Sequence, residues 1–318
     1  MEHRELGRSG VRVPRIALGC GNFGGVGSAP EFFGQGVPRA EAFRLLDRAY
    51  ELGLTLFDTA DAYGGGSSEE WIGDWLATKG PAVRERVVLL TKVFNPMAAG
   101  ADHGLAPARV RRQLDSSLAR LRVERVDLYL LHEPDPETPL AETLGAFDEL
   151  VSAGKIGAYG VSNVDGAYLR EALAAGSPCC VQNSYSLLDR RDEAEVLPLC
   201  AAHGLGYTPF GPLAGGWLTG KYRRGQPFPA GSRMTQRPEP YGQFVAERVF
   251  AGVEQLEAAA AGHGVSAAAL AFAWLLAHPH VTAVVSGPGR AEHLEPLREA
   301  LAVSLDPGER ERIGSFFE

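Results

Sequence analysis

Short apolar runs alternate with longer amphipathic segments along most of this chain. Each run is brief and is bounded by polar or turn-forming residues, which is typical of strands buried on both faces. The pattern predicts buried strands at residues 16–19, 54–57, 87–91, 126–131, 156–161, 179–182, 205–208 and 282–285.

The segments between these runs carry apolar residues at helical spacing. Residues 39–52 follow this pattern, and Gly53 directly after them is a suitable C-cap. A long irregular segment, rich in glycine, proline and arginine, covers residues 210–242. Further helices are predicted at residues 68–77, 107–121, 139–152, 164–175, 190–203, 244–262, 266–278 and 290–301, with a helical tail from residue 306.

The alternation of strands and helices predicts the fold. Turn signals between His3 and Val13 indicate an N-terminal β-hairpin before the first buried strand. Strand–helix repeats produce a parallel sheet. Eight repeats without an internal linker favour a single (β/α)8 TIM barrel domain over residues 1–318, with extra helices near the C-terminus. A doubly wound open sheet is the alternative.

The composition restricts the partners of such a barrel. A formal net charge of −8 argues against nucleic acid and anionic membranes, which attract basic surfaces. We find no signal peptide pattern and no apolar run long enough to span a bilayer. The four cysteines form no CxxC pair and no metal-ligand cluster, so we expect reduced thiols, no metal site and a cytoplasmic location. The oligomeric state is left open.

One stretch matches the dinucleotide fingerprint G-x-G-x-x-G, namely residues 19–24. That motif holds a pyrophosphate only when a helix begins directly after it. Here glycine and proline recur through residues 25–36, which excludes the first turns of a helix. We therefore reject a Rossmann site and expect these glycines to allow a close approach of the backbone.

Titratable side chains stand at the ends of three successive predicted strands. Asp58 follows the second run, Lys92 ends the third and His132 follows the fourth. Tyr63 lies on the loop just after Asp58. Because the C-terminal strand ends of a barrel surround its active site, we expect these four groups to face one cavity.

Together these groups form a proton donor directed at a carbonyl group. A buried Lys92 needs a counter-ion, which Asp58 is placed to supply. The cation favours phenolate and is expected to lower the pKa of Tyr63. His132 would orient a carbonyl oxygen or share the proton transfer.

These residues resemble the aldo-keto reductases. Asp58-Thr-Ala-Asp-Ala-Tyr63-Gly, Leu-Thr-Lys92-Val and Leu-Leu-His132 are similar to the segments that carry the catalytic tetrad of that family, and the likeness covers nearly the whole chain. It implies reversible reduction of an aldehyde or ketone by NAD(P)H. Hydride passes from nicotinamide C4 to the carbonyl carbon, Tyr63 protonates the oxygen, Lys92 and Asp58 tune Tyr63, and His132 positions a small carbonyl substrate.

The same resemblance implies contacts to the cofactor. Ser162, Asn163 and Gln182 look like the positions that hold the nicotinamide carboxamide, and Tyr207 like the aromatic residue on which the ring stacks. The other implied contacts are Gly21, Asn22 and Asp58 near the nicotinamide, Thr208, Pro209 and Phe210 after Tyr207, Gly220, Lys221 and Arg233 at the pyrophosphate, and Gly287, Gly289, Arg290 and His293 in the adenosine segment.

The adenosine segment departs from the family pattern at one point. Pro296-Leu297 stands in place of the usual Glu-Asn pair that contacts adenine. Lys221, Arg290 and His293 nevertheless supply cations for a 2′-phosphate, so we expect NADPH rather than NADH as the cofactor.

Two other functions are compatible with a barrel of this kind. In a Schiff-base lyase such as an aldolase, Lys92 would be the nucleophile, but pairing with Asp58 favours a charged lysine, which is a poor one. A non-catalytic NADP(H)-binding regulatory subunit, as occurs among relatives attached to ion channels, would bind the cofactor without turnover. The intact tetrad argues against it.

The remaining notable residues have simpler interpretations. We expect Asp61, Glu69 and Glu70 to face solvent or to fix their loop, and Trp217 to belong either to the core or to the substrate rim. Substrate identity is expected to depend on residues 98–104 and 210–242 and on an insert at residues 25–37 that carries Phe32 and Phe33.

Overall fold

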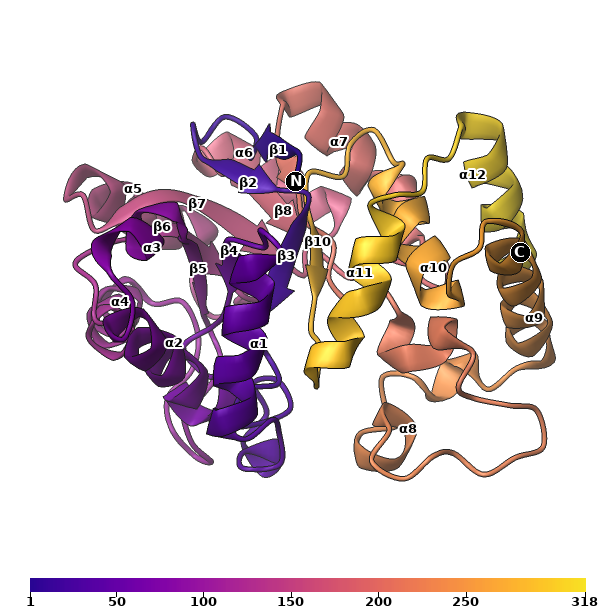
Figure 1. Cartoon of the computed structure of the whole chain (residues 1–318). Helices are drawn as coiled ribbons and strands as arrows, with labels where there is room; N and C mark the ends of the chain where they lie inside the picture. Colours follow the sequence, from indigo (N-terminus) through magenta and orange to yellow (C-terminus); the bar gives the residue numbers. More distant parts are fainter.

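Eight parallel strands form the centre of the molecule in the computed structural model, which describes all residues from Met1 to Glu318 (Figure 1). Their order is β10-β3-β4-β5-β6-β7-β8-β9, so strands consecutive in sequence are neighbours in space. All the predicted strands are confirmed, with small shifts at their ends. The strands are β3 Ile16–Gly19, β4 Leu56–Asp58, β5 Val88–Val93, β6 Val126–Leu131, β7 Ile156–Ser162, β8 Cys180–Gln182, β9 Gly206–Tyr207 and β10 Val284–Ser286.

The ring closes between β9 and β10 through separate backbone hydrogen bonds rather than a continuous ladder. The amide of Thr282 donates to the carbonyl of Tyr207 over 2.8 Å, and that of Val285 donates to Pro209 over 2.8 Å. Pro209 has no N–H with which to continue the ladder, which explains its interruption here. The closure confirms the predicted (β/α)8 barrel and excludes the open doubly wound sheet.

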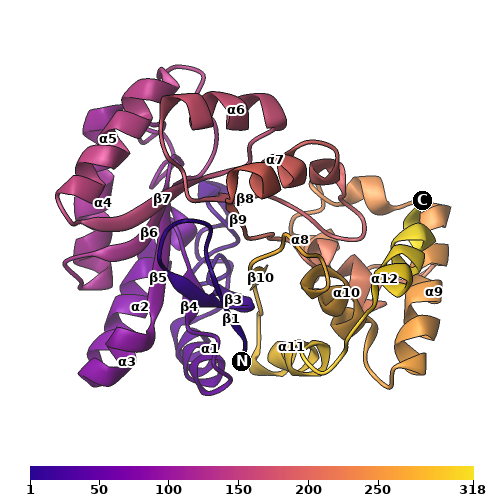
Figure 2. The ribbon, with the colours of Figure 1, turned by 90° about the horizontal axis from the view of Figure 1, so that it is seen from above.

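Helices surround the strands and bury their apolar faces against them (Figure 2). In α1, for example, Leu45, Leu46 and Ala49 are buried on one face. The helices are α1 Arg39–Glu51, α2 Ser67–Ala77, α3 Pro81–Arg86, α4 Pro107–Leu121, α5 Leu140–Ser152, α6 Gly166–Ala175, α7 Val196–His203, α8 Arg233–Gln236, α9 Glu247–Gly262, α10 Ala267–Leu276, α11 Glu295–Ala300 and α12 Pro307–Gly314, with short 3₁₀ helices η1 Pro30–Phe32, η2 Tyr63–Gly66, η3 Arg191–Glu193, η4 Ala214–Thr219, η5 Gly242–Phe244, η6 Ala291–Leu294 and η7 Ser315–Phe317.

Two observed α-helices begin later in the sequence than predicted. The α-helix predicted at residues 190–203 begins only with α7, and residues 290–301 divide into η6 and α11. Pro198 and Pro296 each lie in the first turn of the observed α-helix, where the backbone N–H needs no intrahelical partner. Deeper in a helix each proline would remove a hydrogen bond and clash with the preceding turn. The prolines therefore determine where these helices begin.

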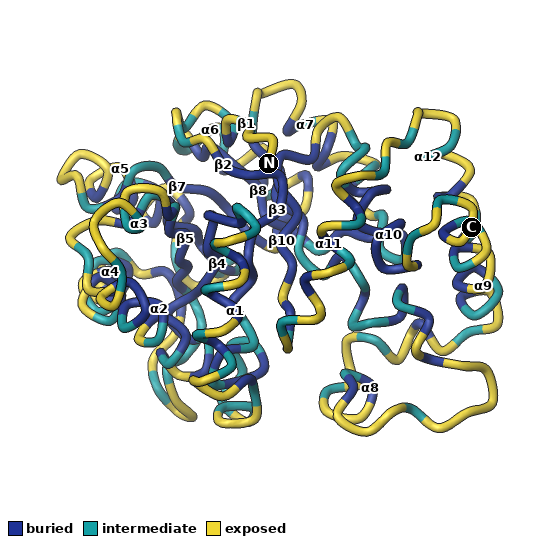
Figure 3. The backbone as a smooth tube through the Cα atoms, in the orientation of Figure 1, coloured by how far each residue is buried: buried dark blue, intermediate teal, exposed yellow.

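The apolar core has two parts, separated by the barrel wall. The smaller part lies inside the barrel and includes Leu6 and Val13 from the predicted hairpin, formed by β1 His3–Glu5 and β2 Arg12–Pro14. The larger part lies between the strands and the helices, and the exposed residues form the outer surface (Figure 3). The hairpin closes the amino end of the barrel, so ligands must approach from the carboxyl end of the strands.

No single helix reaches the length and apolarity needed to cross a membrane. The consecutive helices α9 and α10 reach them only when taken together, and they meet at an angle of 87°. All four cysteines are free and buried, as expected from the sequence.

Candidate active site

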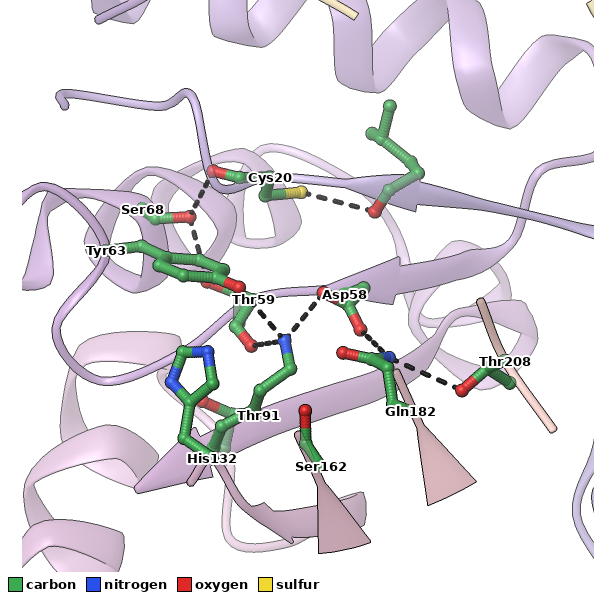
Figure 4. Close-up of polar contacts among 12 residues, drawn as sticks. Cys20, Asp58, Thr59, Tyr63, Ser68, Thr91, His132, Ser162, Gln182 and Thr208 are labelled. Carbon is green, nitrogen blue, oxygen red and sulfur yellow. Dashed lines mark hydrogen bonds and ion pairs between the residues drawn. The ribbon is translucent and has the colours of Figure 1, made fainter. Parts of the chain in front are cut away.

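Lys92 is the centre of the polar cluster at the carboxyl end of the barrel (Figure 4). It lies on β5 and is completely buried. Its Nζ donates to Asp58 Oδ1 over 2.7 Å, to the carbonyl of Thr59 over 2.8 Å and to the Tyr63 hydroxyl over 3.3 Å. Burial alone would lower the pKa of Lys92, but Asp58 and Tyr63 outweigh it and raise the pKa. The ammonium is charged, and all three of its N–H groups have an acceptor.

Asp58 ends β4 and links Lys92 to the opposite side of the barrel. Its second oxygen, Oδ2, accepts a hydrogen bond of 2.7 Å from Gln182 Nε2 on β8. Both carboxylate oxygens of this buried side chain are therefore paired. The pairing confirms the predicted counter-ion role of Asp58 and fixes the orientation of the Gln182 amide.

Tyr63 begins η2, on the loop after β4, and its hydroxyl lies beside Lys92. The loop turns tightly enough because Gly64 has φ 59°, where a Cβ atom would lie 2.5 Å from the carbonyl of Phe23. Burial raises the pKa of Tyr63, and the opposing effect of Lys92 is smaller. The predicted net lowering of this pKa is therefore wrong. The phenol keeps its proton at neutral pH.

His132 follows β6 and lies edge-on to Tyr63, with 5.5 Å between the ring centroids. Its carbonyl accepts from Asn163 Nδ2 over 2.9 Å. Burial, and secondarily Lys92, lower the pKa of His132 well below its usual range. The structure thus brings all four members of the predicted tetrad together, with a protonated phenol next to a neutral imidazole.

The residues predicted to hold a nicotinamide carboxamide surround this cluster. Ser162 ends β7, Asn163 follows it with a left-handed φ of 57°, and Gln182 ends β8. Asn163 Nδ2 also lies 3.3 Å from Ser162 Oγ. Because Gln182 commits its Nε2 to Asp58, its amide oxygen is left as an acceptor for a ligand N–H.

Gly21 and Asn22 lie on the loop after β3, close to Tyr63. A Cβ atom on Gly21 would be 3.4 Å from the Tyr63 ring, which places the Gly21 backbone directly against the phenol. Asn22 Nδ2 donates to the carbonyl of Gly287 over 3.0 Å, and its Oδ1 accepts from Arg233 on α8. Asn22 therefore ties together three loops on which cofactor contacts were predicted.

A cluster of cations lies further along the same side of the mouth. Lys221, Arg233 and Arg290 are close enough for their charges to interact, and none of them forms a salt bridge with a carboxylate. Burial, with the charges of Arg290 and Lys221, lowers the pKa of His293, so this ring is neutral at neutral pH and the predicted cation at this position is wrong. Desolvation, with the charges of Arg233 and Arg290, lowers the pKa of Lys221. The backbone amide of Gly289 donates to His293 Nδ1 over 3.2 Å. Unpaired cations crowded in this way suit a phosphate group.

The predicted stacking role of Tyr207 is wrong. Its ring is fully buried in the outer part of the core, and its hydroxyl donates to Asp192 Oδ2 over 2.7 Å. The next residue, Thr208, points inward and lies 3.4 Å from Gln182 Nε2. Phe210 is the aromatic residue that packs against the inner cluster and remains partly exposed. Pro209 and Gly220 are buried, and Gly220 has φ 76° at the end of η4.

Burial decides between the alternatives that the sequence left open for Asp61, Glu69, Glu70 and Trp217. Asp61 and Glu69 are completely buried rather than facing solvent, whereas Glu70 is exposed. Glu69 accepts from the hydroxyl of Thr91, over 2.5 Å, and from Arg120, over 2.8 Å. Trp217 is 1% exposed among other aromatic rings and belongs to the core.

The insert at residues 25–37 packs beside the loop that carries Tyr63. The amide of Gly64 donates to the carbonyl of Gly27 over 3.4 Å, and Phe33 lies against Gly65. Across the mouth, the guanidinium of Arg237 lies 5.1 Å from the centre of the Phe32 ring. Sequence reasoning did not single out Arg237, because its pairing with Phe32 spans about two hundred residues.

Comparisons with known proteins agree with this geometry. The sequence model of the Aldo/keto reductase family matches residues 15–318. The uncharacterized oxidoreductase YrpG of Bacillus subtilis strain 168 is 36% identical over 321 residues, covering 96% of this chain and 93% of that protein. The NADH-specific methylglyoxal reductase of Escherichia coli K12 is 32% identical over 319 residues, covering 96% and 95%. The solved structure of the thermostable aldo-keto reductase Tm1743 with the inhibitor epalrestat has a TM-score of 0.79 at 32% identity, covering 99% of this chain and 100% of that one. The chain belongs to the aldo/keto reductase family.

Proposed function

We propose that residues 1–318 form one domain that reduces an aldehyde or ketone of a small substrate to an alcohol, with Tyr63 as the proton donor. Membership of the family makes the protein an NAD(P)H-dependent oxidoreductase. The observation that carries the assignment of Tyr63 is the triple hydrogen bonding of Lys92 to Asp58, Thr59 and Tyr63.

The proton chemistry follows from the direction of these hydrogen bonds. Lys92 is a donor only, so the Tyr63 oxygen accepts from it and directs its own O–H elsewhere, towards the mouth. The raised pKa keeps that proton in place until a carbonyl oxygen becomes basic. Lys92 then stabilises the phenolate left behind, which regains a proton from solvent. Asp58 holds Lys92 charged and in position.

The bound cofactor supplies the hydride that forms the new C–H bond of the alcohol. Its site is proposed from polar and aromatic groups at the mouth of the barrel, among which the Gln182 amide oxygen is left as an acceptor. The Gln182 amide oxygen, Asn163 and Ser162 would hold the carboxamide, and Phe210 is the aromatic residue available to the ring. Gly287 and Gly289, where a Cβ atom would meet no atom closer than 3.5 Å, would leave room for the pyrophosphate and ribose, whereas the space beside the predicted contact Gly220 is filled by the Glu257 carboxylate.

NADPH is the proposed cofactor, because the cluster of Lys221, Arg233 and Arg290 forms no salt bridge with a carboxylate of the protein. A 2′-phosphate would neutralise it. One relative is named as NADH-specific, so the assignment needs a direct comparison. A panel of aldehydes and ketones, assayed with NADPH and NADH side by side, supplies it. A higher kcat/KM with NADH would contradict the proposal.

The assignment of Tyr63 is tested by Tyr63→Phe. Removing the hydroxyl leaves the ring in place, so we expect kcat to fall by at least about 100-fold. The dissociation constant of NADPH, measured by quenching of protein fluorescence, should change little. Tyr50→Phe, which lies on α1 away from the cluster, is the matched control and should retain full activity. A Tyr63→Phe enzyme of wild-type kcat would refute the role.

The Schiff-base alternative conflicts with the state of Lys92. An amine nucleophile must be neutral and free, whereas this ammonium is charged and fully hydrogen-bonded. Borohydride treatment in the presence of the carbonyl panel should therefore trap no adduct on Lys92. A regulatory subunit without turnover would bind NADPH but oxidise it with no member of the panel.

A further inference from the structure

His132 is held from two sides by asparagine side chains. Asn163 Nδ2 donates to its carbonyl over 2.9 Å. On the other side Asn95, on the loop after β5, places its Nδ2 3.3 Å from His132 Nδ1. The second ring nitrogen, Nε2, lies on the side of the Tyr63 hydroxyl (Figure 4). The two ring nitrogens therefore have different surroundings, one inside the protein wall and one at the mouth.

We propose that Asn95 is a positioning residue that fixes the tautomer of His132. An amide N–H donates only to a ring nitrogen that carries no proton. The contact therefore makes Nδ1 the acceptor and leaves the proton of the neutral imidazole on Nε2. Nε2–H faces the place where Tyr63 meets a carbonyl oxygen. The inference rests on the proposed function and decides between the two roles considered for His132: it donates a hydrogen bond to the substrate and takes no proton from Tyr63.

The imidazole carries a single proton because of its surroundings. His132 is 8% exposed, and the titratable groups that face it are Lys92 and Tyr63. Burial and the ammonium of Lys92 both disfavour an imidazolium. With one proton shared between two nitrogens, the partner of Nδ1 determines what Nε2 offers to the substrate.

Asn95 is itself held in place by a buried arginine. Arg109, on α4 and 3% exposed, donates to the carbonyl of Asn95 over 2.8 Å and to that of Gly104 over 2.9 Å. These bonds fasten both ends of the loop at residues 95–104. Residues 98–104, which were expected to contribute to substrate identity, therefore lie in the same loop as the side chain that we propose orients His132.

The tautomer can be read without any turnover. In a two-bond ¹H–¹⁵N correlation spectrum of the full-length protein labelled with ¹⁵N-histidine, His132 is the signal absent from His132→Gln. We expect the Nε2–H form in the wild type. In Asn95→Asp the side chain has the same shape but only accepts, so the signal should change to the Nδ1–H form or to imidazolium. An Nδ1–H tautomer in the wild type, or an unchanged tautomer in Asn95→Asp, overturns the proposal.

Measurements of kcat distinguish a positioning role of Asn95 from a purely structural one. Asn95→Asp should lower kcat by about 100-fold at pH 7 to 8, because the donor to the substrate oxygen is lost. Asn95→Ala removes the contact without favouring the Nδ1–H tautomer, so its kcat should fall less than that of Asn95→Asp. The new carboxylate raises the pKa of His132, so the loss in Asn95→Asp should shrink as the pH falls and imidazolium restores Nε2–H. Equal losses in both variants with parallel pH profiles would overturn the proposal.

The two levels of the proposal fail separately. If the wild type reduces no carbonyl of the panel while His132 shows the Nε2–H tautomer that depends on Asn95, the proposed function is wrong and the positioning contact stands. If the wild type is active and the His132 tautomer is the same in the wild type and Asn95→Asp, the proposed function stands and the positioning role of Asn95 is wrong.

Discussion

Lys92 and Lys221 are two lysines at the same end of the barrel in opposite electrostatic situations. Lys92 is enclosed and has three acceptors, and its pKa is raised. Lys221 lies among other cations without a carboxylate, and its pKa is lowered. The charge of Lys92 is neutralised by Asp58 within the protein, which suits a group that acts on the neighbouring Tyr63. The charge of Lys221 is left without a counter-ion, as a site that receives an anionic ligand requires.

The largest effect is expected from Lys92→Met. Loss of the ammonium leaves Asp58 buried without its cation, which should lower the free energy of unfolding by about 3–5 kcal/mol. The phenolate of Tyr63 would also lose its stabilising donor, so kcat should fall by at least about 1,000-fold. Urea denaturation and NADPH oxidation with an active carbonyl of the panel measure the two effects. Lys221→Met breaks no pair and should unfold like the wild type; equal destabilisation by both variants would contradict the distinction.

The next effect concerns Asp61, a buried acid whose charged neighbours are Glu69, Arg109 and Arg120. Its Oδ2 has no hydrogen-bond partner. Burial, and secondarily Glu69, raise the pKa of Asp61 from 3.8 to about 8. Between those values the unfolded chain releases a proton that the folded protein retains. The free energy of unfolding should therefore fall as the pH rises, by up to about 1.4 kcal/mol per pH unit from this group.

Asp61→Asn removes this dependence while preserving the shape of the side chain. Urea unfolding at pH 5, 6, 7 and 8 should show a flatter profile for the variant than for the wild type, and greater stability of the variant at the upper end. Glu70→Gln, an exposed change on α2, is the control and should follow the wild type. Parallel profiles for Asp61→Asn and the wild type would show that Asp61 is ionised in the folded state.

The smallest effect is expected at the unpaired cluster. Arg290→Ala should lower kcat/KM for NADPH by about tenfold, the value of one charge-assisted contact, and leave NADH nearly unaffected. Arg298→Ala, an exposed change on α11 that removes an ion pair with Glu295, is the matched control. Equal losses with both cofactors would mean that Arg290 does not contact the 2′-phosphate.

The aromatic residue available to the nicotinamide could not be predicted correctly from the sequence. Tyr207 and Phe210 lie in one short segment, and the sequence assigned the nicotinamide to the first. Side chains alternate between the two faces of a strand, but β9 contains only Gly206–Tyr207, and Pro209 interrupts its pairing. Alternation along the strand therefore could not predict which of the two aromatic rings faces the inside of the barrel. The hydrogen bond between Tyr207 and Asp192 shows that its ring belongs to the outer core.

Burial explains the other differences between expectation and structure. Asp61 and Glu69 are charged residues in a loop and a first helical turn, which sequence places in solvent by default. The approach of Arg109, Arg120 and Thr91 from other strands and helices encloses them. The net pKa of Tyr63 depends on the same quantity, because its burial outweighs the cation beside it.

The strand–helix repeat, the barrel and the positions of Asp58, Tyr63, Lys92 and His132 at its mouth are properties of the sequence by itself. They depend on local periodicity and on the rule that parallel strands end at one face. Only the tertiary structure decided how each group is solvated, which aromatic ring faces inward, and that Asn95 meets His132. Those outcomes depend on contacts between segments far apart in the chain, and their energies are set by burial, which no local pattern records.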